Sequence, residues 1–471
     1  MKFDFRLMMK GAVGPAGVGA GDLSRFERWA AAAHEDLARR RARGELPHLD
    51  FPHRRPDAAL RKGRDLRRGC RDYVLAGYGG AGLSGRTWIQ SLRPDLAGIL
   101  TGSPKHPRFH FVNDVDPDAT ADLLKGVDWR RAVVHLISKG GDSPEILSHF
   151  YIARDRLRRG SRPADWARRL LVTTGPGKGA LRRLAREGGH PISTFPDSLS
   201  GRFALFSDVG LLPAAVAGID VRALLRGAAW MDRRCESPSL SVNPALLGAA
   251  LHFLAARRGL RTSVIMPYHR DLKPAAEYFR FVWAGSLGKR VDLKGREVFA
   301  GLTPLTAVGM EDQHSQVQLF AEGPFDKTLT FLTLDLVSSD VRIPAGKESI
   351  LRGRTLSQVN RIWAESTARG LAAQGRPSGA ISLPRLDAFW AGALLYYFQR
   401  LTLYLAALFE VNPYNQPGVA PAKKIAAARL GRSAEAGPPA GQDALFLDFS
   451  EDAADGRRSR SNPGRGRRGR T

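Results

Sequence analysis

The chain has 471 residues, 43% of them hydrophobic and 25% charged, and a formal net charge of +26. This length allows about three domains, and this hydrophobic content excludes a chain that is disordered throughout. The two cysteines, Cys70 and Cys235, lack metal-ligand spacing and favour a reduced, cytoplasmic protein.

Residues 1–60 predict a helical extension. Its start has no apolar stretch long enough for a secretory signal. The segment from Asp22 to Arg43 begins with capping residues and carries apolar residues at helical spacing, so we expect a helix there.

From about residue 61, short apolar runs alternate with helical patterns. The first four runs are Asp72–Ala76, Arg108–Asn113, Ala132–Ile137 and Arg169–Thr173. A second set includes Thr262–Met266, a helix through Lys289, and Thr328–Leu334. Short apolar strands separated by helices are typical of a parallel, doubly wound α/β sheet, which binds ligands at the carboxyl ends of its strands.

Two long helices, Thr355–Ala373 and Arg385–Phe409, follow the second set. The apolar tract at residues 388–409 contains Gln399 and Arg400, which a bilayer would make costly. It therefore predicts a buried core or interface helix and no membrane partner. We expect two α/β domains, residues 61–230 and 240–430, with a boundary near Gly227 to Pro244.

Residues 431–471 are rich in Gly, Pro and Arg and predict a disordered tail. An acidic and apolar island, Asp443–Ser450, is either linker or a docking segment for a partner. The arginines between Arg457 and Arg470 either bind nucleic acid or another polyanion, or they form a solvated tail without function.

Two turns after predicted strands have features of phosphate sites. In Gly77–Leu83, glycines let backbone N–H groups approach an anion, although the spacing does not fit the dinucleotide fingerprint. In Ser138–Glu145, hydroxyls and a lysine stand at a strand-to-helix junction. The same residues also fit an ordinary helix start, with Asp142 or Ser143 as the N-cap.

A third stretch, Met310–Leu319, gathers hydrogen-bonding side chains around His314. Taken in order, the three stretches resemble motifs of the glucose-6-phosphate isomerase family, whose phosphosugar-isomerase (SIS) domains carry them. The resemblance covers roughly Asp22 to Leu430. Further matching stretches are Leu199–Pro213, Trp283–Lys289, Gly375–Pro377, Ser382–Pro384 and Val411–Val419.

The resemblance implies two flavodoxin-like SIS sheets, a homodimer, and interconversion of glucose 6-phosphate and fructose 6-phosphate in glycolysis and gluconeogenesis. It implies no metal and no organic cofactor. His314 and Lys423 match the residues that open the sugar ring, and Arg202 matches the arginine that stabilises the enediolate. The implied substrate- and phosphate-binding positions are Gly79, Gly80, Ser138, Lys139, Ser143 and Glu145.

The chain departs from the family pattern at the proton-shuttling glutamate, where it has Gly285. Loss of a general base costs roughly a hundred- to ten-thousandfold in rate. Glu311, near His314, is a possible substitute, although it also fits an exposed loop charge. Other departures are Ala81, Gly140, Asp142, Ala204 and Ala420. The alternative function is therefore a catalytically impaired homologue that binds a sugar phosphate or another anionic ligand.

Overall fold

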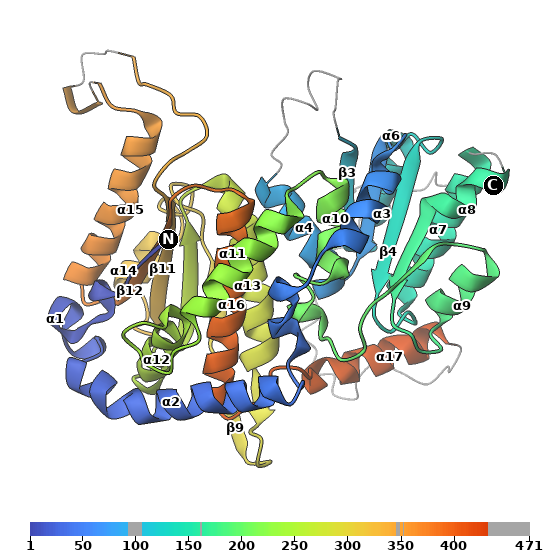
Figure 1. Ribbon diagram of the computed structural model, residues 1–471. Helices are drawn as coiled ribbons and strands as arrows, with labels where there is room; N and C mark the ends of the chain where they lie inside the picture. Colours follow the sequence, from blue (N-terminus) through green and yellow to red (C-terminus); the bar gives the residue numbers. More distant parts are fainter. Residues whose placement is uncertain (93–105, 161–162, 345–348, 352, 432–471) are drawn as a thin grey trace, which may run out of the picture. The chain divides into compact units, whose positions relative to one another are not determined.

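The computed structural model describes residues 1–92, 106–160, 163–344, 349–351 and 353–431 (Figure 1). Contacts divide the chain into a compact unit, Met1–Pro417, and a second unit, Gly418–Thr471. The described part of the second unit contains helix α17 (Ala420–Leu430). The island at 443–450 and the arginine-rich tail lie outside the described residues.

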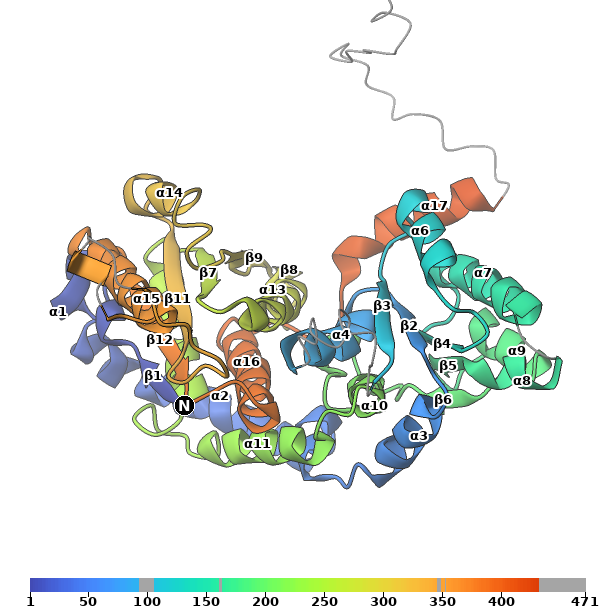
Figure 2. The same cartoon turned by 90° about the horizontal axis from the view of Figure 1, so that it is seen from above.

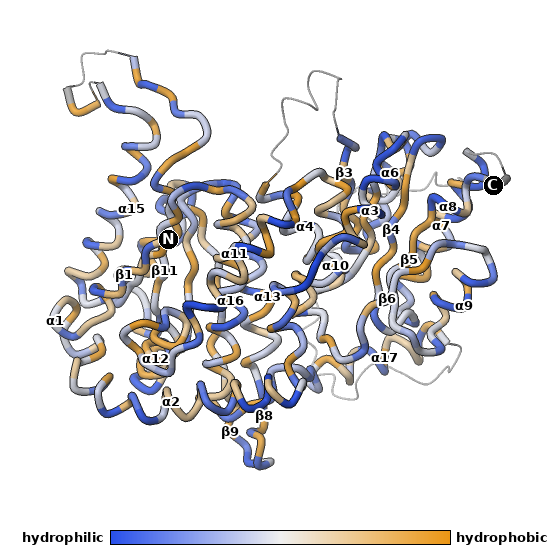
Figure 3. The backbone as a smooth tube through the Cα atoms, in the orientation of Figure 1, coloured by the Kyte–Doolittle hydropathy of each residue, from blue (hydrophilic) through white to orange (hydrophobic). Residues whose placement is uncertain are grey.

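The first sheet has five parallel strands in the order β3-β2-β4-β5-β6. These strands are β2 (Asp72–Gly77), β3 (Arg108–Val112), β4 (Ala132–Ser138), β5 (Leu170–Thr174) and β6 (Ile192–Thr194). The helices between them are α4 (Gly80–Leu92), α6 (Pro117–Gly126), α7 (Pro144–Gly160), α8 (Pro163–Arg169) and α9 (Ala180–Glu187). Most of β4 is hydrophobic (Figure 3), because helices on both faces of a parallel sheet keep its strands from water.

The second sheet has the order β1-β12-β11-β7-β10. Its strands are β1 (Lys2–Asp4), β7 (Thr262–Pro267), β10 (Thr303–Thr306), β11 (Lys327–Leu334) and β12 (Ser378–Leu383). All neighbours pair in parallel except β1, which pairs antiparallel with β12. A small hairpin of β8 (Lys289–Val291) and β9 (Glu297–Ala300) stands apart from both sheets.

A group of helices fills the space between the two sheets of this unit (Figure 2). Helix α16 (Ala388–Leu408) forms its core, and Ala391–Ala406 are buried without interruption. Its neighbours include α2 (Ala20–Ala42), α11 (Val221–Arg234), α12 (Pro244–Arg257) and α13 (Lys273–Leu287), while α4 packs on α13 and on α10 (Asp208–Val216). The remaining helices are α1 (Lys10–Val13), α3 (Asp57–Arg67), α14 (Val317–Glu322) and α15 (Leu356–Ala373).

The predicted α/β class with parallel sheets is confirmed, and the apolar tract at residues 388–409 is a core helix. Gln399 donates to the Tyr278 hydroxyl (2.7 Å), and Arg400 pairs with Asp232 (3.2 Å), so both polar side chains have partners inside the core. No helix in the described ranges is long and apolar enough to cross a membrane. The division at residues 61–230 and 240–430 stays a prediction.

Two local predictions were wrong. The helix expected to reach Lys289 ends at Leu287, and Lys289 begins strand β8 after Gly288. The mixed composition of the run from Phe299 to Gly309 predicts a loop, but this run contains β10, which pairs with β7. Both strands are three or four residues long, too short for alternation to distinguish them from loop.

Candidate active site

Arg202 lies in a short 3-10 helix, Gly201–Phe203, and its side chain is buried. Its Nε donates to Ser286 Oγ (3.1 Å), and its Nη2 donates to the Pro413 carbonyl (2.7 Å). Burial lowers the pKa of Arg202 to about 10, so the group stays positively charged at neutral pH. Nη1 has no hydrogen-bond partner among the described residues and is available to a ligand.

Gly285 lies beside this guanidinium on α13. A Cβ atom there would stand 2.6 Å from Gln416 Nε2 and 2.8 Å from Arg202 Cδ. The Gln416 amide therefore occupies the space that a side chain at 285 would need. An amide has no basic oxygen comparable to a carboxylate, so Gln416 fills the position without supplying a base.

A pocket of about 560 Å³ opens next to Gly285 and Gln416. One wall is the glycine turn after β2 with the start of α4, and another is the end of β3 at Val112 and Asn113. The third wall is one face of α13, which presents Glu277, Arg280, Phe281, Ala284 and Gly285 at helical spacing. The pocket thus lies at the carboxyl ends of two neighbouring parallel strands, where such sheets bind ligands.

The predicted glycine turn contributes directly to this pocket. Gly79, which lines it, has a φ of +57°, in the left-handed region that favours glycine. A Cβ atom at Gly80 would stand 2.2 Å from the Gly201 carbonyl oxygen. Gly80 therefore lets the turn touch the loop that carries Arg202, so two motifs about 120 residues apart meet at one place.

The charged lining residues Arg86, Glu277 and Arg280 did not come from the sequence motifs. Arg86 on α4 pairs with Glu277 on α13 (3.3 Å), while Arg280 has no ion pair in the part of the chain that the structure describes. Helical spacing from Gly285 could have identified the residues on α13 from the sequence. Glu277 and Phe281 stand eight and four residues before Gly285, on the same face of a helix.

The loop after β4 satisfies its own polar groups. Ser138 Oγ accepts from the Gly141 N–H (3.1 Å), and Lys139 Nζ donates to the Asp197 carbonyl (2.7 Å). The Asp142 carboxylate accepts from the Ala180 N–H (2.7 Å) and so caps α9, whereas the sequence suggested a cap on its own helix, α7. Ser143 is half-buried and Glu145 exposed; residues 138–145 do not contribute to the pocket lining.

The His314 segment is a turn before α14, held by Asp312. The Asp312 carboxylate accepts from the Val308 N–H (2.5 Å) and from Ser315 Oγ (2.6 Å). His314 and Glu311 are both exposed, and neither is among the described residues that line the pocket. Lys423 is exposed on α17, in the second unit.

No group of three or more His, Cys, Asp or Glu side chains within the described ranges could hold a metal ion. The polar side chains of the residues that line the pocket are instead two arginines, one glutamate and two amides. Such a lining suits a small, hydroxylated and anionic ligand.

The sequence matches the phosphoglucose isomerase family over residues 67–437. It is 35% identical to the glucose-6-phosphate isomerase of Carboxydothermus hydrogenoformans, covering 92% of this chain and 95% of that protein. For the Rubrobacter xylanophilus enzyme of the same name the identity is 37%, covering 77% and 83%.

Among solved structures, a hypothetical protein from Thermus thermophilus superposes with a TM-score of 0.80 at 33% identity, covering 91% of this chain and 99% of that one. A glucose-6-phosphate isomerase from Chlamydia trachomatis has a TM-score of 0.69 at 24% identity, covering 80% and 74%. The second likeness bears on the fold alone.

Proposed function

The chain belongs to the phosphoglucose isomerase family, and from that premise we propose that it interconverts glucose 6-phosphate and fructose 6-phosphate. The observation that carries the proposal is the position of Arg202. Its guanidinium is buried beside the pocket at the carboxyl ends of β2 and β3, and its Nη1 has no hydrogen-bond partner among the described residues. Moving a proton between C2 and C1 of the open-chain sugar creates an enediolate. A fixed positive group that needs no reorganisation stabilises that charge.

The test is a coupled assay with fructose 6-phosphate on the purified chain and on Arg202→Ala. We expect measurable turnover by the wild type and a loss of kcat of about a hundred- to a thousandfold in the variant, because an oxyanion donor is removed. Arg376→Ala is the matched control: Arg376 is also buried and also bonds backbone carbonyls, Gly323 and Pro324, outside the pocket lining. A wild type without turnover contradicts the proposal and favours a sugar-phosphate-binding homologue.

For the phosphate group we propose Gly79 and Gly80 in the glycine turn together with Ser138, Lys139, Ser143 and Glu145. The ammonium of Lys139 and the hydroxyl of Ser138 now bond within the protein. A bound phosphate would accept from the Lys139 ammonium in place of the Asp197 carbonyl, and from the Ser138 O–H, whose oxygen keeps the bond from the Gly141 N–H. Such charge-assisted hydrogen bonds are about twice as strong as neutral ones.

For ring opening we propose His314 and Lys423, with Glu311 as the substitute for the base missing at Gly285. His314 and Glu311 share one exposed turn outside the pocket lining. In a homodimer, which we propose from the family resemblance, a partner's turn could enter the pocket. Both groups would then arrive together.

Mixing two inactive chains tests this arrangement. Arg202→Ala lacks the pocket's arginine, and a Glu311→Gln, His314→Ala double variant lacks the turn's groups. If each site combines two chains, unfolding and refolding the mixture restores about a quarter of the sites, one in each mixed dimer. If the mixture stays inactive, His314 does not cross between subunits. We also propose a cytoplasmic location, because Cys70 and Cys235 are both free thiols.

A further inference from the structure

Helix α3 (Asp57–Arg67) carries Arg61, Arg64 and Arg67, three residues apart, along one face. The helix packs closely on α10, since a Cβ atom at Gly63 would stand 2.6 Å from the Cβ of Ala215. This tight contact brings the arginine stems against the end of α10, and Figure 1 shows the two helices side by side.

A pocket of about 380 Å³ lies at this contact. Apolar side chains of Leu60, Ala215 and Ile219 line part of it, and the charged lining consists of four arginines and Asp57. We call it the arginine pocket, after Arg61, Arg64, Arg67 and Arg222. It shares no lining residue with the pocket beside Gly285.

Among the residues that the structure describes, the charges in the arginine pocket are not balanced. Arg222 pairs with Asp57 (2.8 Å), but the side chains of Arg61, Arg64 and Arg67 form no ion pair or hydrogen bond with any described residue. Many other arginines of this basic chain do have acidic partners, for example Arg25 and Arg258, which both pair with Asp22. Four guanidinium groups against one carboxylate repel one another unless an anion lies between them.

The backbone around the pocket accommodates these arginines. Gly218 has a φ of +72°, and a Cβ atom there would stand 2.5 Å from His106 Cε1 and 2.7 Å from Arg67 Nη1, so glycine leaves the space that the imidazole and the guanidinium occupy together. Arg222 stands in the first turn of α11, where the helix dipole makes a cation unfavourable and an anion favourable. The dipole and the unpaired arginines thus favour the same charge of ligand.

We propose that the arginine pocket binds a small ligand with two or more phosphoryl groups, such as a sugar bisphosphate or a nucleoside diphosphate. Planar guanidinium groups match phosphate oxygens in pairs, and three uncompensated positive charges suit a ligand with several negative charges. The apolar part of the lining accommodates the carbon skeleton. This site is separate from the isomerase site and does not depend on the function proposed there.

Calorimetric titration of the full chain with inorganic pyrophosphate tests the proposal, with fructose 6-phosphate present to fill the isomerase site. The variant is Arg61→Gln, Arg64→Gln, Arg67→Gln. The matched control is Arg28→Gln, Arg156→Gln, Arg158→Gln, which removes three exposed helix arginines without ion pairs to any described residue and gives the same net charge. All three proteins are compared at one ionic strength, because screening changes anion affinity.

We expect the wild type and the control to bind alike and the pocket variant to bind at least tenfold more weakly. Equal weakening in both variants, or no binding by the wild type, overturns the proposal. Arg64→Gln alone, with unchanged circular dichroism, replaces the triple variant if that one does not fold. Competition by a hexose bisphosphate or by a nucleoside diphosphate then tells the two ligand sources apart, and failure of both to compete also overturns the proposal.

Discussion

Arg202, Gly285 and Gln416 form the contact on which the chemistry of the proposed isomerase site depends. Gly285 on α13 has no side chain, and the Gln416 amide lies where the Cβ atom of a larger residue would stand. The Arg202 guanidinium is held by the backbone carbonyls of Pro413 and Asn415, whereas no described residue forms a hydrogen bond with the Gln416 side chain. Any carboxylate restored here must therefore displace Gln416.

Gly285→Glu by itself should give little gain in turnover, because its Cβ would meet Gln416 and Arg202 at less than contact distance. The double variant Gly285→Glu, Gln416→Ala removes the closer contact, so that only Arg202 Cδ has to move, by a few tenths of an ångström. It should raise kcat by at least tenfold, since a positioned base contributes about a hundred- to ten-thousandfold. Both are measured in the coupled assay beside Gln416→Ala alone. Equal rates in the two Gly285→Glu variants would show that Gln416 is no obstacle.

At the scale of single residues, the sequence motifs led to Arg202, Gly79 and Gly285, which the structure brings to one place. They could not reveal that Gln416 lies against Gly285, because about 130 residues separate the two positions. The sequence could not reveal the partner of Asp142 either, since Asp142 caps α9 and not α7, the helix that directly follows it in the chain. Such contacts depend on how distant segments pack, which local pattern does not contain.

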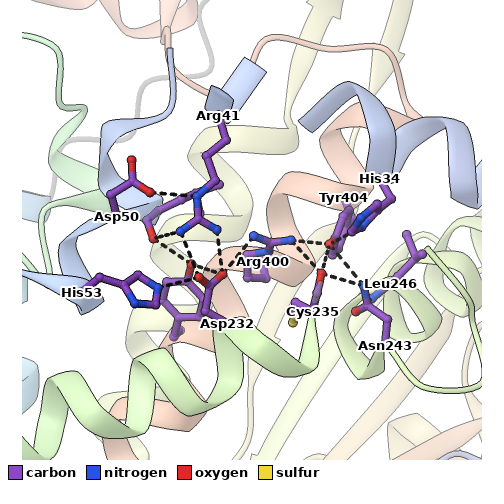
Figure 4. A network of polar contacts seen from close by, with 12 residues as sticks. His34, Arg41, Asp50, His53, Asp232, Cys235, Asn243, Leu246, Arg400 and Tyr404 are labelled. Atoms are coloured by element: carbon purple, nitrogen blue, oxygen red, sulfur yellow. Dashed lines mark hydrogen bonds and ion pairs between the residues drawn. The ribbon is translucent and has the colours of Figure 1, made fainter. Parts of the chain in front are cut away.

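Among the elements, α16 depends on a buried polar network at its middle (Figure 4). Asp232 on α11 is buried and accepts hydrogen bonds from Arg41 (3.0 Å), Arg400 (3.2 Å) and Tyr396 (2.7 Å). Burial acts to raise the pKa of Asp232, but Arg400, Arg41 and His53 together hold it below its usual range. The carboxylate thus joins α2, α11 and α16.

Asp232→Asn leaves Arg400 buried without its counter-charge and should lower the free energy of unfolding by about 3–5 kcal/mol. The measurement is urea unfolding at pH 7. Asp50→Asn is the control, because Asp50 also pairs with Arg41 (2.8 Å) but is half exposed, and such pairs contribute at most about 1 kcal/mol. Similar losses in both variants would contradict a special role for the buried carboxylate.

The cap from Asp142 to Ala180 gives a second prediction for an element. Asp142→Ala leaves an N–H group at the start of α9 without its partner and should lower stability by about 1 kcal/mol. Asp142→Asn keeps an oxygen acceptor and should change stability by much less. Because the carboxylate is turned to the helix, KM for fructose 6-phosphate should stay within about twofold in Asp142→Asn; a large fall in KM would place the charge at the phosphate.

The predicted alternation of strands and helices is confirmed for β2, β3, β4, β5, β7 and β11, whose apolar runs were long enough to recognise. Strand β12 was not predicted, because it starts with Ser378 and Gly379 and has no continuous apolar run. Strands β1, β6, β8, β9 and β10 escaped prediction for a different reason. Each has three or four residues, and each forms only because a longer partner or a hairpin turn supplies its hydrogen bonds.

For the molecule as a whole, acid should be destabilising because several histidines are buried in neutral form. Burial lowers the pKa of His48 and His135 to about 3 and that of His252 to about 4. In the unfolded chain a histidine titrates near pH ~6.5, so between about pH 6.5 and about 4 the unfolded chain binds protons that the folded chain does not. The contribution of these histidines to stability is therefore complete above about pH 6.5 and falls as the pH falls.

Each of these histidines should lower the free energy of unfolding by about 1.4 kcal/mol for every pH unit that the pH falls well below about 6.5. Urea unfolding at pH 7, 6, 5 and 4 measures the slope. His252→Phe keeps an aromatic ring beside Trp283. Whatever the variant does to stability at pH 7, it should make the dependence of the unfolding free energy on pH less steep by the contribution of one histidine. An unchanged slope would mean that His252 is protonated in the folded state.

The antiparallel pairing of β1 with β12 has a consequence for biosynthesis. Residues 2–4 are translated some 375 residues before their partner strand, Ser378–Leu383. At about 5–20 residues per second, β1 must wait on the order of tens of seconds for the strand that it pairs with. The first sheet can meanwhile assemble from strands within residues 72–194, whereas the second can close only after β12 has been translated.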